Sequence, residues 1–211
     1  MAPSTLTAAE ITAALVDDLL ESHPDAVVLR EFTCPAGRVD LLAITDALHG
    51  FEVKSDFDSL QRVDAQLAAY SRYCQTLTFV AGRTLAIQLL RSLPSWCGVR
   101  LAIRGEHGVS LLDLRESRRN PLADAQHAAL LLHREELRSL TGHQEARASR
   151  AKLRKLFTSS ADDEVEMFER IAASLRRRAP LRSVAQRESC DDSSLPEATF
   201  LGFQFASSPL R

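Results

Sequence analysis

The chain has 211 residues, of which 45% are hydrophobic and 26% charged, so its composition is that of a globular protein and excludes a disordered one. The formal net charge of −2 excludes a strongly basic or acidic chain, and no apolar run approaches the roughly 18–20 residues of a membrane span. The four cysteines form no CxxC pair, and the start MAPSTLTAAE has neither the basic nor the apolar part of a signal peptide, so we expect a cytoplasmic protein with no membrane partner.

The first predicted element is a helix over residues 7–22. Its apolar residues recur every four positions, at Ile11, Leu15 and Leu19. Thr7 and Glu10 have the S/T-x-x-E spacing of a capping box, in which each side chain satisfies a backbone N–H at the start of a helix. The pattern therefore predicts an amphipathic helix with one apolar face.

Three strand-like segments follow, at residues 26–33, 38–46 and 49–55. The CPAG link between the first two suits a turn through its Pro and Gly. The short ALHG link between the second and third suits a hairpin in which Gly50 adopts a positive φ. The three segments are therefore expected to form an antiparallel meander.

Helices and strands alternate after the meander. A helix is expected over residues 58–74, with Asp58 as its N-cap and an apolar stripe made of Leu60, Val63, Leu67, Tyr70 and Cys74. The remaining elements are expected to be a strand at 76–82, a helix at 84–93 and two strands at 98–104 and 108–115. This order predicts an α/β domain at about residues 1–118, with a mixed sheet flanked by helices.

The pattern changes to an α-helical extension over residues 119–180, with helices expected at 122–140, 149–157 and 161–178. Residues 141–187 carry eleven Lys/Arg against six Asp/Glu, so this part of the chain is locally basic. Such a segment can bind nucleic acid, or it can be a solvated helix face, a helical lid on the sheet or a dimerisation element. Residues 181–211 are rich in Ser, Pro and charge and are expected to form a tail, although residues 200–206 alternate like a strand.

Three charged side chains stand out in or beside the strand-like segments: Asp40, Glu52 and Lys54. Charged groups are costly to bury in a sheet unless they are paired or bind a metal. Glu52 and Lys54 are two positions apart, so both side chains leave the same face of the sheet, and a hairpin can bring Asp40 close to Glu52. Two carboxylates suit a hard divalent cation, and a neighbouring amine suits the orientation of a nucleophile or the stabilisation of charge on a phosphate.

The pattern Asp40 followed by Glu52-Val53-Lys54 resembles the D-x(n)-(D/E)-x-K signature of the PD-(D/E)XK nuclease superfamily, in a bacterial branch of it. Gln66 and Tyr70 resemble the Q-x-x-x-Y element that follows this signature on a helix in some members. The resemblance covers roughly residues 7–115 and implies a restriction-endonuclease-like fold. Position 39 departs from the pattern, because it is valine where the superfamily name has proline.

The resemblance implies a metal-dependent nuclease that hydrolyses phosphodiester bonds of DNA. Asp40 and Glu52 would be ligands of Mg²⁺ or Mn²⁺, with the Val53 carbonyl as a third ligand and Glu31 as an additional acidic residue near the metal. Lys54 would be the catalytic lysine. Gln66 and Tyr70 would brace that lysine or contact phosphate.

Several of these residues also have simpler interpretations. Arg38 can contact phosphate, pair with Asp40 or be solvated, and Tyr70 lies in the apolar stripe, so packing alone can explain it. In the extension, DNA-phosphate contacts are expected from Arg147, Arg150, Lys152, Arg154 and Lys155.

Two other functions stay open on the sequence. One is a catalytically inactive nuclease-fold module that binds nucleic acid. The other is an accessory subunit of a repair or defence complex, which meets a protein partner, or a second copy of the chain, through the helical extension.

Overall fold

A computed structural model of the chain describes residues 5–106, 108–142, 147–160 and 163–178. The strands are β1 (Val27–Cys34), β2 (Gly37–Ile44), β3 (Leu48–Lys54), β4 (Thr76–Ala81), β5 (Gly98–Gly105) and β6 (Gly108–Arg115). The helices are α1 (Ala8–Ser22), α2 (Val63–Tyr70), α3 (Arg83–Ser92), α4 (Ala125–Ala128), α5 (Arg134–Thr141), α6 (Arg150–Ser160) and α7 (Glu164–Arg178), and a 3₁₀ turn, η1 (Ala129–Leu131), follows α4. The predicted tail at 181–211, with its strand-like stretch 200–206, lies outside the described residues.

The six strands form one mixed sheet in the order β1-β2-β3-β4-β5-β6. β1, β2 and β3 are the predicted antiparallel meander, whereas β4 runs parallel to both β3 and β5, and β6 closes the sheet antiparallel to β5. The parallel pairs require crossover connections, which α2 and α3 supply. The predicted α/β class with a mixed sheet flanked by helices is therefore confirmed.

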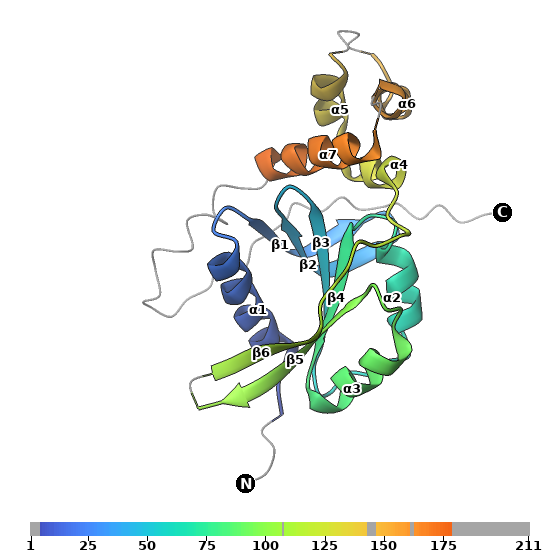
Figure 1. Ribbon diagram of the computed structural model, residues 1–211. Helices are drawn as coiled ribbons and strands as arrows, with labels where there is room; N and C mark the ends of the chain where they lie inside the picture. Colours follow the sequence, from blue (N-terminus) through green and yellow to red (C-terminus); the bar gives the residue numbers. More distant parts are fainter. Residues whose placement is uncertain (1–4, 107, 143–146, 161–162, 179–211) are drawn as a thin grey trace, which may run out of the picture.

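Two apolar layers cover the two faces of the sheet (Figure 1). On one face, the predicted stripe of α1 is buried against alternate residues of β2 and β3, among them Leu41, Phe51 and Val53. The opposite face packs against α2 and α3 through Leu42, Ile44, Leu48, Leu77 and Phe79. Since side chains alternate along a strand, the even-numbered residues of β3 belong to this second face, as do Leu42 and Ile44 of β2.

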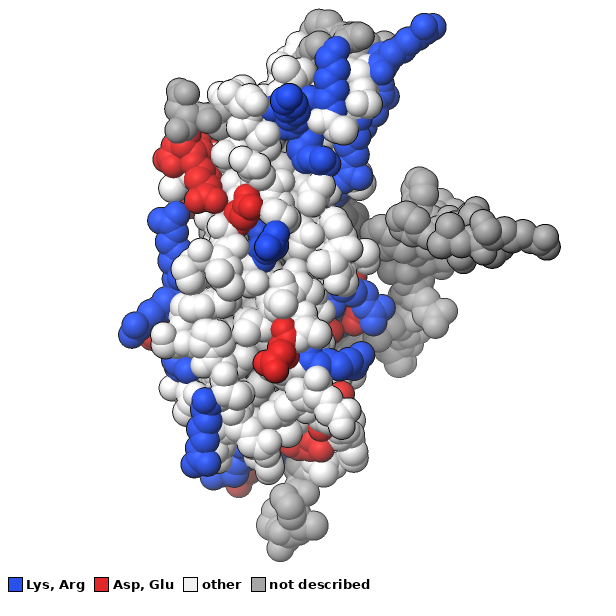
Figure 2. Space-filling model, turned by 90° about the vertical axis from the view of Figure 1, so that its right-hand side faces the viewer, with Lys and Arg blue, Asp and Glu red and all other residues white. Residues whose placement is uncertain are grey.

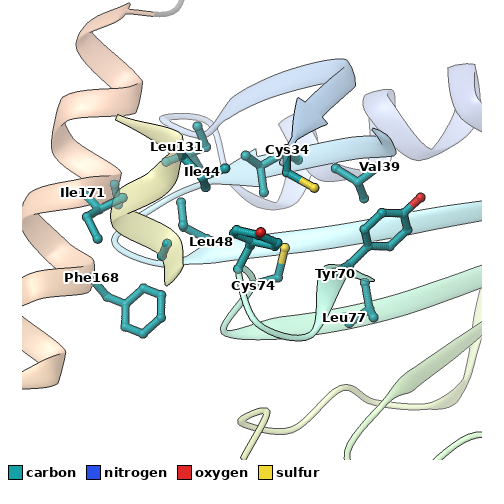
Figure 3. Packing of buried hydrophobic residues seen from close by; sticks show 14 of the residues in the cluster. Cys34, Val39, Ile44, Leu48, Tyr70, Cys74, Leu77, Leu131, Phe168 and Ile171 are labelled. Atoms are coloured by element: carbon teal, nitrogen blue, oxygen red, sulfur yellow. The ribbon is translucent and has the colours of Figure 1, made fainter. Parts of the chain in front are cut away.

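The helical extension belongs to the same core as the second face of the sheet. Phe157, Phe168 and Ile171 are almost completely buried and fall in one cluster with sheet residues such as Leu48. Figure 3 shows Phe168 and Ile171 of α7 beside Leu131, on the side of the core away from Tyr70. The predicted domains 1–118 and 119–180 therefore share a continuous apolar interior.

Hydrogen bonds fix α7 to the end of the meander where a turn joins β2 to β3. Arg176 donates to the carbonyl oxygens of Thr45 at 3.4 Å and of Asp25 at 3.0 Å. Thr45 lies in the turn between β2 and β3, and Asp25 directly precedes β1. The extension thus covers the turn end of the β2–β3 hairpin, and the other end of this hairpin stays open.

The predicted helix over 122–140 is wrong as a single element. The backbone leaves the helical region at Leu132 and His133, and a new capping box between His133 and Glu136 starts α5. The apolar periodicity across this break misled the prediction, because the side chains on both sides of it face the same core. The other two predicted helices of the extension correspond to α6 and to α7, which begins at Glu164.

The predicted N-cap at Asp58 is also wrong. The Asp58 carboxylate accepts hydrogen bonds from the backbone N–H and the hydroxyl of Ser55, at 2.8 and 2.6 Å, so it closes a turn that precedes the helix. Helix α2 begins at Val63, five residues later than expected. The predicted stripe nevertheless faces the core, with Val63, Tyr70 and Cys74 buried.

Gly50 does not lie in the hairpin turn, as its link suggested, but inside β3, where it pairs with Leu42. The structure gives it no positive φ. An added Cβ would lie 2.9 Å from the Cys74 sulfur and 3.0 Å from Leu77 Cδ1, and both of those side chains are buried. Glycine is required here by close packing and not by backbone conformation.

Gly50→Ala is therefore expected to lower the free energy of unfolding by about 1–3 kcal/mol through overpacking. Intrinsic preference predicts the opposite sign, because alanine is favoured over glycine inside a strand by roughly 0.5–1 kcal/mol. Urea unfolding of Gly50→Ala and of the unaltered protein distinguishes these outcomes. Gly105→Ala is the matched control, since the nearest atom to its added Cβ is 3.6 Å away; equal stabilities of the two variants would contradict the packing explanation.

The capping box of α1 is present as predicted, and Glu10 also accepts a hydrogen bond from Arg104 of β5 at 2.6 Å. The bond from the Thr7 backbone, followed by the bond from Arg104, lowers the pKa of Glu10 from 4.5 to about 2. A carboxyl group with a lowered pKa in the folded state stabilises that state above its unfolded pKa, and this stabilisation is lost as the pH falls through the folded pKa.

Glu10→Gln is accordingly expected to unfold more easily than the unaltered protein at neutral pH. The difference should shrink as the pH falls from about 4.5 towards 2, the range between the two pKa values. Thermal unfolding of both proteins at pH 7, 4 and 2.5 tests this. A difference that stays constant over this range would contradict the ionic role of Glu10.

Among the described residues, no helix combines the length and the apolar character that crossing a bilayer requires.

Candidate functional site

The site lies where β2 and β3 separate at the open end of their hairpin. Backbone pairing between these strands ends at Leu41 and Phe51, while β3 continues alongside β4 as far as Lys54. Beyond the last pair, the Asp40 carboxylate accepts a hydrogen bond from the Val53 N–H at 2.8 Å. A side chain therefore takes over from the backbone ladder, and a gap opens between the two strands.

Three of the predicted site residues come together in this gap. Glu52 and Lys54 project from the face of the sheet that carries α2, where both contact Gln66, and Asp40 reaches the same gap through its bond from the Val53 N–H. Glu52 is 2% and Lys54 3% exposed, so both charged groups are buried. The spacing argument from the sequence predicted this shared face.

Gln66 of α2 completes a closed network with Glu52 and Lys54. The Lys54 ammonium donates to Glu52 Oε1 at 2.8 Å and to Gln66 Oε1 at 2.7 Å, and the Gln66 amide nitrogen also donates to Glu52 Oε1. The other carboxylate oxygen, Glu52 Oε2, is buried and has no hydrogen-bond partner among the described residues. An unpartnered buried carboxylate oxygen is costly, and it marks a position where a cation or donor would be stabilised.

Burial and the neighbouring Asp40 destabilise the charged form of Glu52. Burial, followed by the charge of Asp40, raises the pKa of Glu52 from 4.5 to about 7, against the opposing effects of Lys54 and Gln66. Burial also raises the pKa of Asp40, although the bond from the Val53 N–H and the charge of Lys54 act in the opposite direction. One ammonium faces the buried carboxylate of Glu52 and the partly buried carboxylate of Asp40, so additional positive charge would be stabilised at this site.

Tyr70 positions the strand that carries Asp40. Its hydroxyl donates to the Arg38 carbonyl oxygen at 2.6 Å, and Figure 3 shows its ring in the core near Val39, with the hydroxyl pointing away from Cys74 and Leu77. Burial and the charges of Glu52 and Asp40 raise the pKa of Tyr70 to about 12, so the phenol stays protonated. Tyr70 therefore packs in the core, as one of its two interpretations had it, and its hydroxyl bonds the start of β2 and not Lys54.

Glu31 and Arg38 form an ion pair at the rim of the site, with 2.7 Å between Arg38 Nε and Glu31 Oε2. Both side chains are more than half exposed. Glu31 is the one non-glycine residue of the described chain with positive φ, at 52°, and it interrupts the register of β1 and β2 beside Asp40, because the residues on either side of it pair with those on either side of Asp40. The structure therefore brings Glu31 near Asp40 but engages its carboxylate with Arg38.

A cavity of about 720 Å³ opens over these groups. Its walls include every residue predicted for the centre of the site: Glu31, Arg38, Asp40, Glu52, Val53, Lys54, Gln66 and Tyr70. The lining residues that the sequence analysis missed include Thr12 of α1, Arg30 of β1 and Arg62 just before α2. The spacing of Arg62 to Gln66, one helical turn, was a usable signal, whereas Thr12 and Arg30 meet the site only through the tertiary fold.

The predicted basic residues of the extension do not line this cavity. Lys and Arg side chains gather at the upper end of the face shown in Figure 2, which is the end that α5 and α6 occupy in Figure 1. Arg150 donates to the carbonyl oxygens of Leu132 and Leu130, so it braces the end of η1. Lys152 and Lys155 are exposed and Arg154 is partly exposed.

No group of three His, Cys, Asp or Glu side chains in the described ranges is arranged to hold a metal ion. The candidate site supplies two carboxylates, and any further ligand would have to be a backbone oxygen, water or phosphate. Two histidines of the described residues bond other groups: His49 bonds Thr45 and Thr76, and His127 bonds Asp124.

Comparison with known proteins places the chain in a phage protein family. Protein cII of Enterobacteria phage P4 is 31% identical over 94 residues, which are 43% of this chain and 36% of the phage protein, so the alignment spans about a third of that relative. The solved structure of the SPO1766 protein of unknown function from Silicibacter pomeroyi is 16% identical, with a TM-score of 0.46, and the match covers 89% of this chain and 98% of that one. A family model described as bacteriophage P4 protein cII matches residues 1–194, and the chain therefore belongs to the bacteriophage P4 cII family.

Proposed function

We propose that this protein is a metal-dependent nuclease that hydrolyses phosphodiester bonds of DNA, and that its α/β fold is of the restriction-endonuclease-like kind. One observation carries the proposal. Asp40, Glu52 and Lys54 meet in a cavity at the point where β2 and β3 separate, and Glu52 Oε2 is buried there without a partner.

The donor set fits a hard divalent cation such as Mg²⁺ or Mn²⁺. Carboxylate oxygens are the ligands that these ions prefer, and Mg²⁺ usually needs only one or two of them from the protein. Burial, followed by the charge of Asp40, raises the pKa of Glu52, and a bound cation would oppose both effects by stabilising the charged carboxylate. Asp40 and Glu52 would hold the ion, with the carbonyl of Val53, a residue that lines the cavity, as a third ligand, and the ion would polarise a phosphate oxygen and acidify a water molecule.

The chain's own residues then have distinct roles. Lys54 is held by Glu52 and Gln66 through bonds of 2.8 and 2.7 Å, which fix its ammonium at the cavity wall, where it can stabilise charge that develops on a phosphate. Gln66 positions that lysine and Tyr70 positions the strand of Asp40. Arg30 and Arg62 line the cavity and can bind the phosphates on either side of the scissile one.

A non-catalytic module that binds nucleic acid, or an accessory subunit, is the second candidate. The observation that favours it is the closed state of the network, because Glu52 Oε1 is occupied by Lys54 and Gln66, and Glu31 is occupied by Arg38. Such a module would bind DNA with a strong dependence on salt, through the exposed lysines of α6, and would form no product.

The two candidates are separated by incubating the protein with linear, circular and single-stranded DNA at increasing Mn²⁺ or Mg²⁺. The nuclease proposal expects cleavage of at least one substrate that stops on addition of EDTA and is lost in Lys54→Ala. Binding without cleavage under every metal condition would favour the second candidate. Cleavage that is unaffected by EDTA or by Lys54→Ala would contradict the mechanism.

A further inference from the structure

One large apolar side chain is displayed beside the candidate site. Phe57 is 72% exposed, more than any other large hydrophobic side chain in the described ranges. It lies three residues after Lys54 and one before Asp58, which lines the cavity. Phe57 does not itself line the cavity, but its neighbour Asp58 does, so the exposed ring lies next to the site, where a flat apolar group of a ligand could cover it.

The turn that carries Phe57 is fixed by hydrogen bonds. The Phe57 N–H donates to the Ser55 hydroxyl at 3.3 Å, and the Asp58 N–H donates to the Ser55 carbonyl at 3.1 Å. On the other side, Asp56 and Leu6 are joined by two hydrogen bonds, of 2.8 and 3.2 Å. The ring is therefore presented by an ordered turn, which reduces the conformational entropy that a contact through it would cost.

The surrounding charges indicate which part of a nucleic acid meets the ring. The carboxylates of Asp56 and Asp58 flank Phe57 and would repel a phosphate at the tip of the turn, whereas a neutral base is not repelled. The cavity wall beyond the turn carries Arg62, which can take the phosphate of the same nucleotide or of its neighbour.

The ring can contact only some bases, and this indicates whether the bound nucleic acid is paired or unpaired. The faces of a base inside a duplex are covered by its neighbours, and only an unstacked base offers a free face to an aromatic side chain. Glu52 is 2% exposed, so a phosphodiester that reaches it must enter the cavity while the adjoining nucleotides cross the rim.

We propose that Phe57 stacks on an unpaired base at the rim of the cavity, and that the preferred substrate is therefore single-stranded DNA or an unpaired end. This inference names the substrate class of the proposed nuclease, and the bound DNA is a substrate only if the proposed function holds. The binding preference itself does not depend on cleavage and is measured separately.

The test compares the affinity for a labelled 20-mer of thymidylate and for a 20-bp duplex, by fluorescence anisotropy in EDTA at one fixed salt concentration. Phe57→Ala is expected to weaken binding of the single strand about 10-fold and of the duplex less than about 2-fold, within the range of single base–aromatic stacks. Phe57→Tyr, which keeps an aromatic face, should stay within about 2-fold of the unaltered protein on both.

Leu122→Ala is the matched control, since Leu122 is 55% exposed and, unlike Phe57, is not next in the chain to a residue that lines the cavity. It should alter neither affinity. Unchanged affinities in Phe57→Ala, as expected for a ring that serves a protein contact, would overturn the inference, and so would equal losses on both DNAs or no DNA binding at all. Selective loss on the single strand in a protein that cleaves nothing with Mn²⁺ would support the stacking role and reject only the nuclease proposal.

Discussion

Glu52→Gln is expected to reduce metal-dependent DNA cleavage by at least about 10³-fold, because it removes one of two carboxylates that would hold the cation. Glutamine keeps the shape of the side chain and an oxygen that can accept from Lys54 and Gln66, so the network of the site can persist. The variant also removes the charge that Asp40 opposes. Cleavage should therefore be lost without loss of the fold, as initial rates and circular dichroism can show.

Glu21→Gln is the control for this prediction, since Glu21 is an exposed carboxylate in the last turn of α1 and does not line the cavity. Its cleavage rate should equal that of the unaltered protein. A Glu52→Gln protein that keeps more than about a tenth of the activity would show that the charge of this side chain does not serve the reaction.

Phe157→Ala is expected to lower the free energy of unfolding by about 3–5 kcal/mol, for the sheet and the helical extension together. Phe157 of α6 is fully buried in the cluster that the extension shares with the sheet, and the Arg170 guanidinium lies 5.0 Å from the centre of its ring. Truncation would leave a cavity and remove this cation–π contact. Since the apolar core is continuous, the protein should unfold in one transition.

Leu156→Ala provides the comparison within the same helix, because Leu156 is 39% exposed. Its unfolding free energy should change by less than about 1 kcal/mol. Two separate transitions in Phe157→Ala, with the sheet domain as stable as before, would show instead that the extension folds as an independent unit.

Local patterns in the sequence were sufficient for the elements whose burial is periodic. The stripe of α1 and its capping box follow from residue spacing alone, and the alternation of side chains along a strand placed Glu52 and Lys54 on one face. The hydrogen bond between Lys54 and Gln66 agrees with one of the two roles that the resemblance implied for Gln66, the bracing of the lysine.

Features that depend on contacts between distant segments were not accessible in this way. Gly50 resembled a turn residue because the sequence does not show that Cys74 lies against it. Arg150 resembled a phosphate contact, yet it bonds two carbonyl oxygens at the end of η1, a role that exists only once the extension has folded. Arg30 reaches the cavity because β1 pairs with β2, and no residue spacing in the sequence indicates that Arg30 lies there.

The central claim is that Asp40 and Glu52 share one divalent cation. Anomalous diffraction from crystals soaked in Mn²⁺ tests it most directly. The proposal predicts one peak within about 2–2.5 Å of an oxygen of each carboxylate. A protein crystallised in Mn²⁺ at neutral to alkaline pH with no peak between these two side chains, or with Mn²⁺ bound only elsewhere, would contradict it.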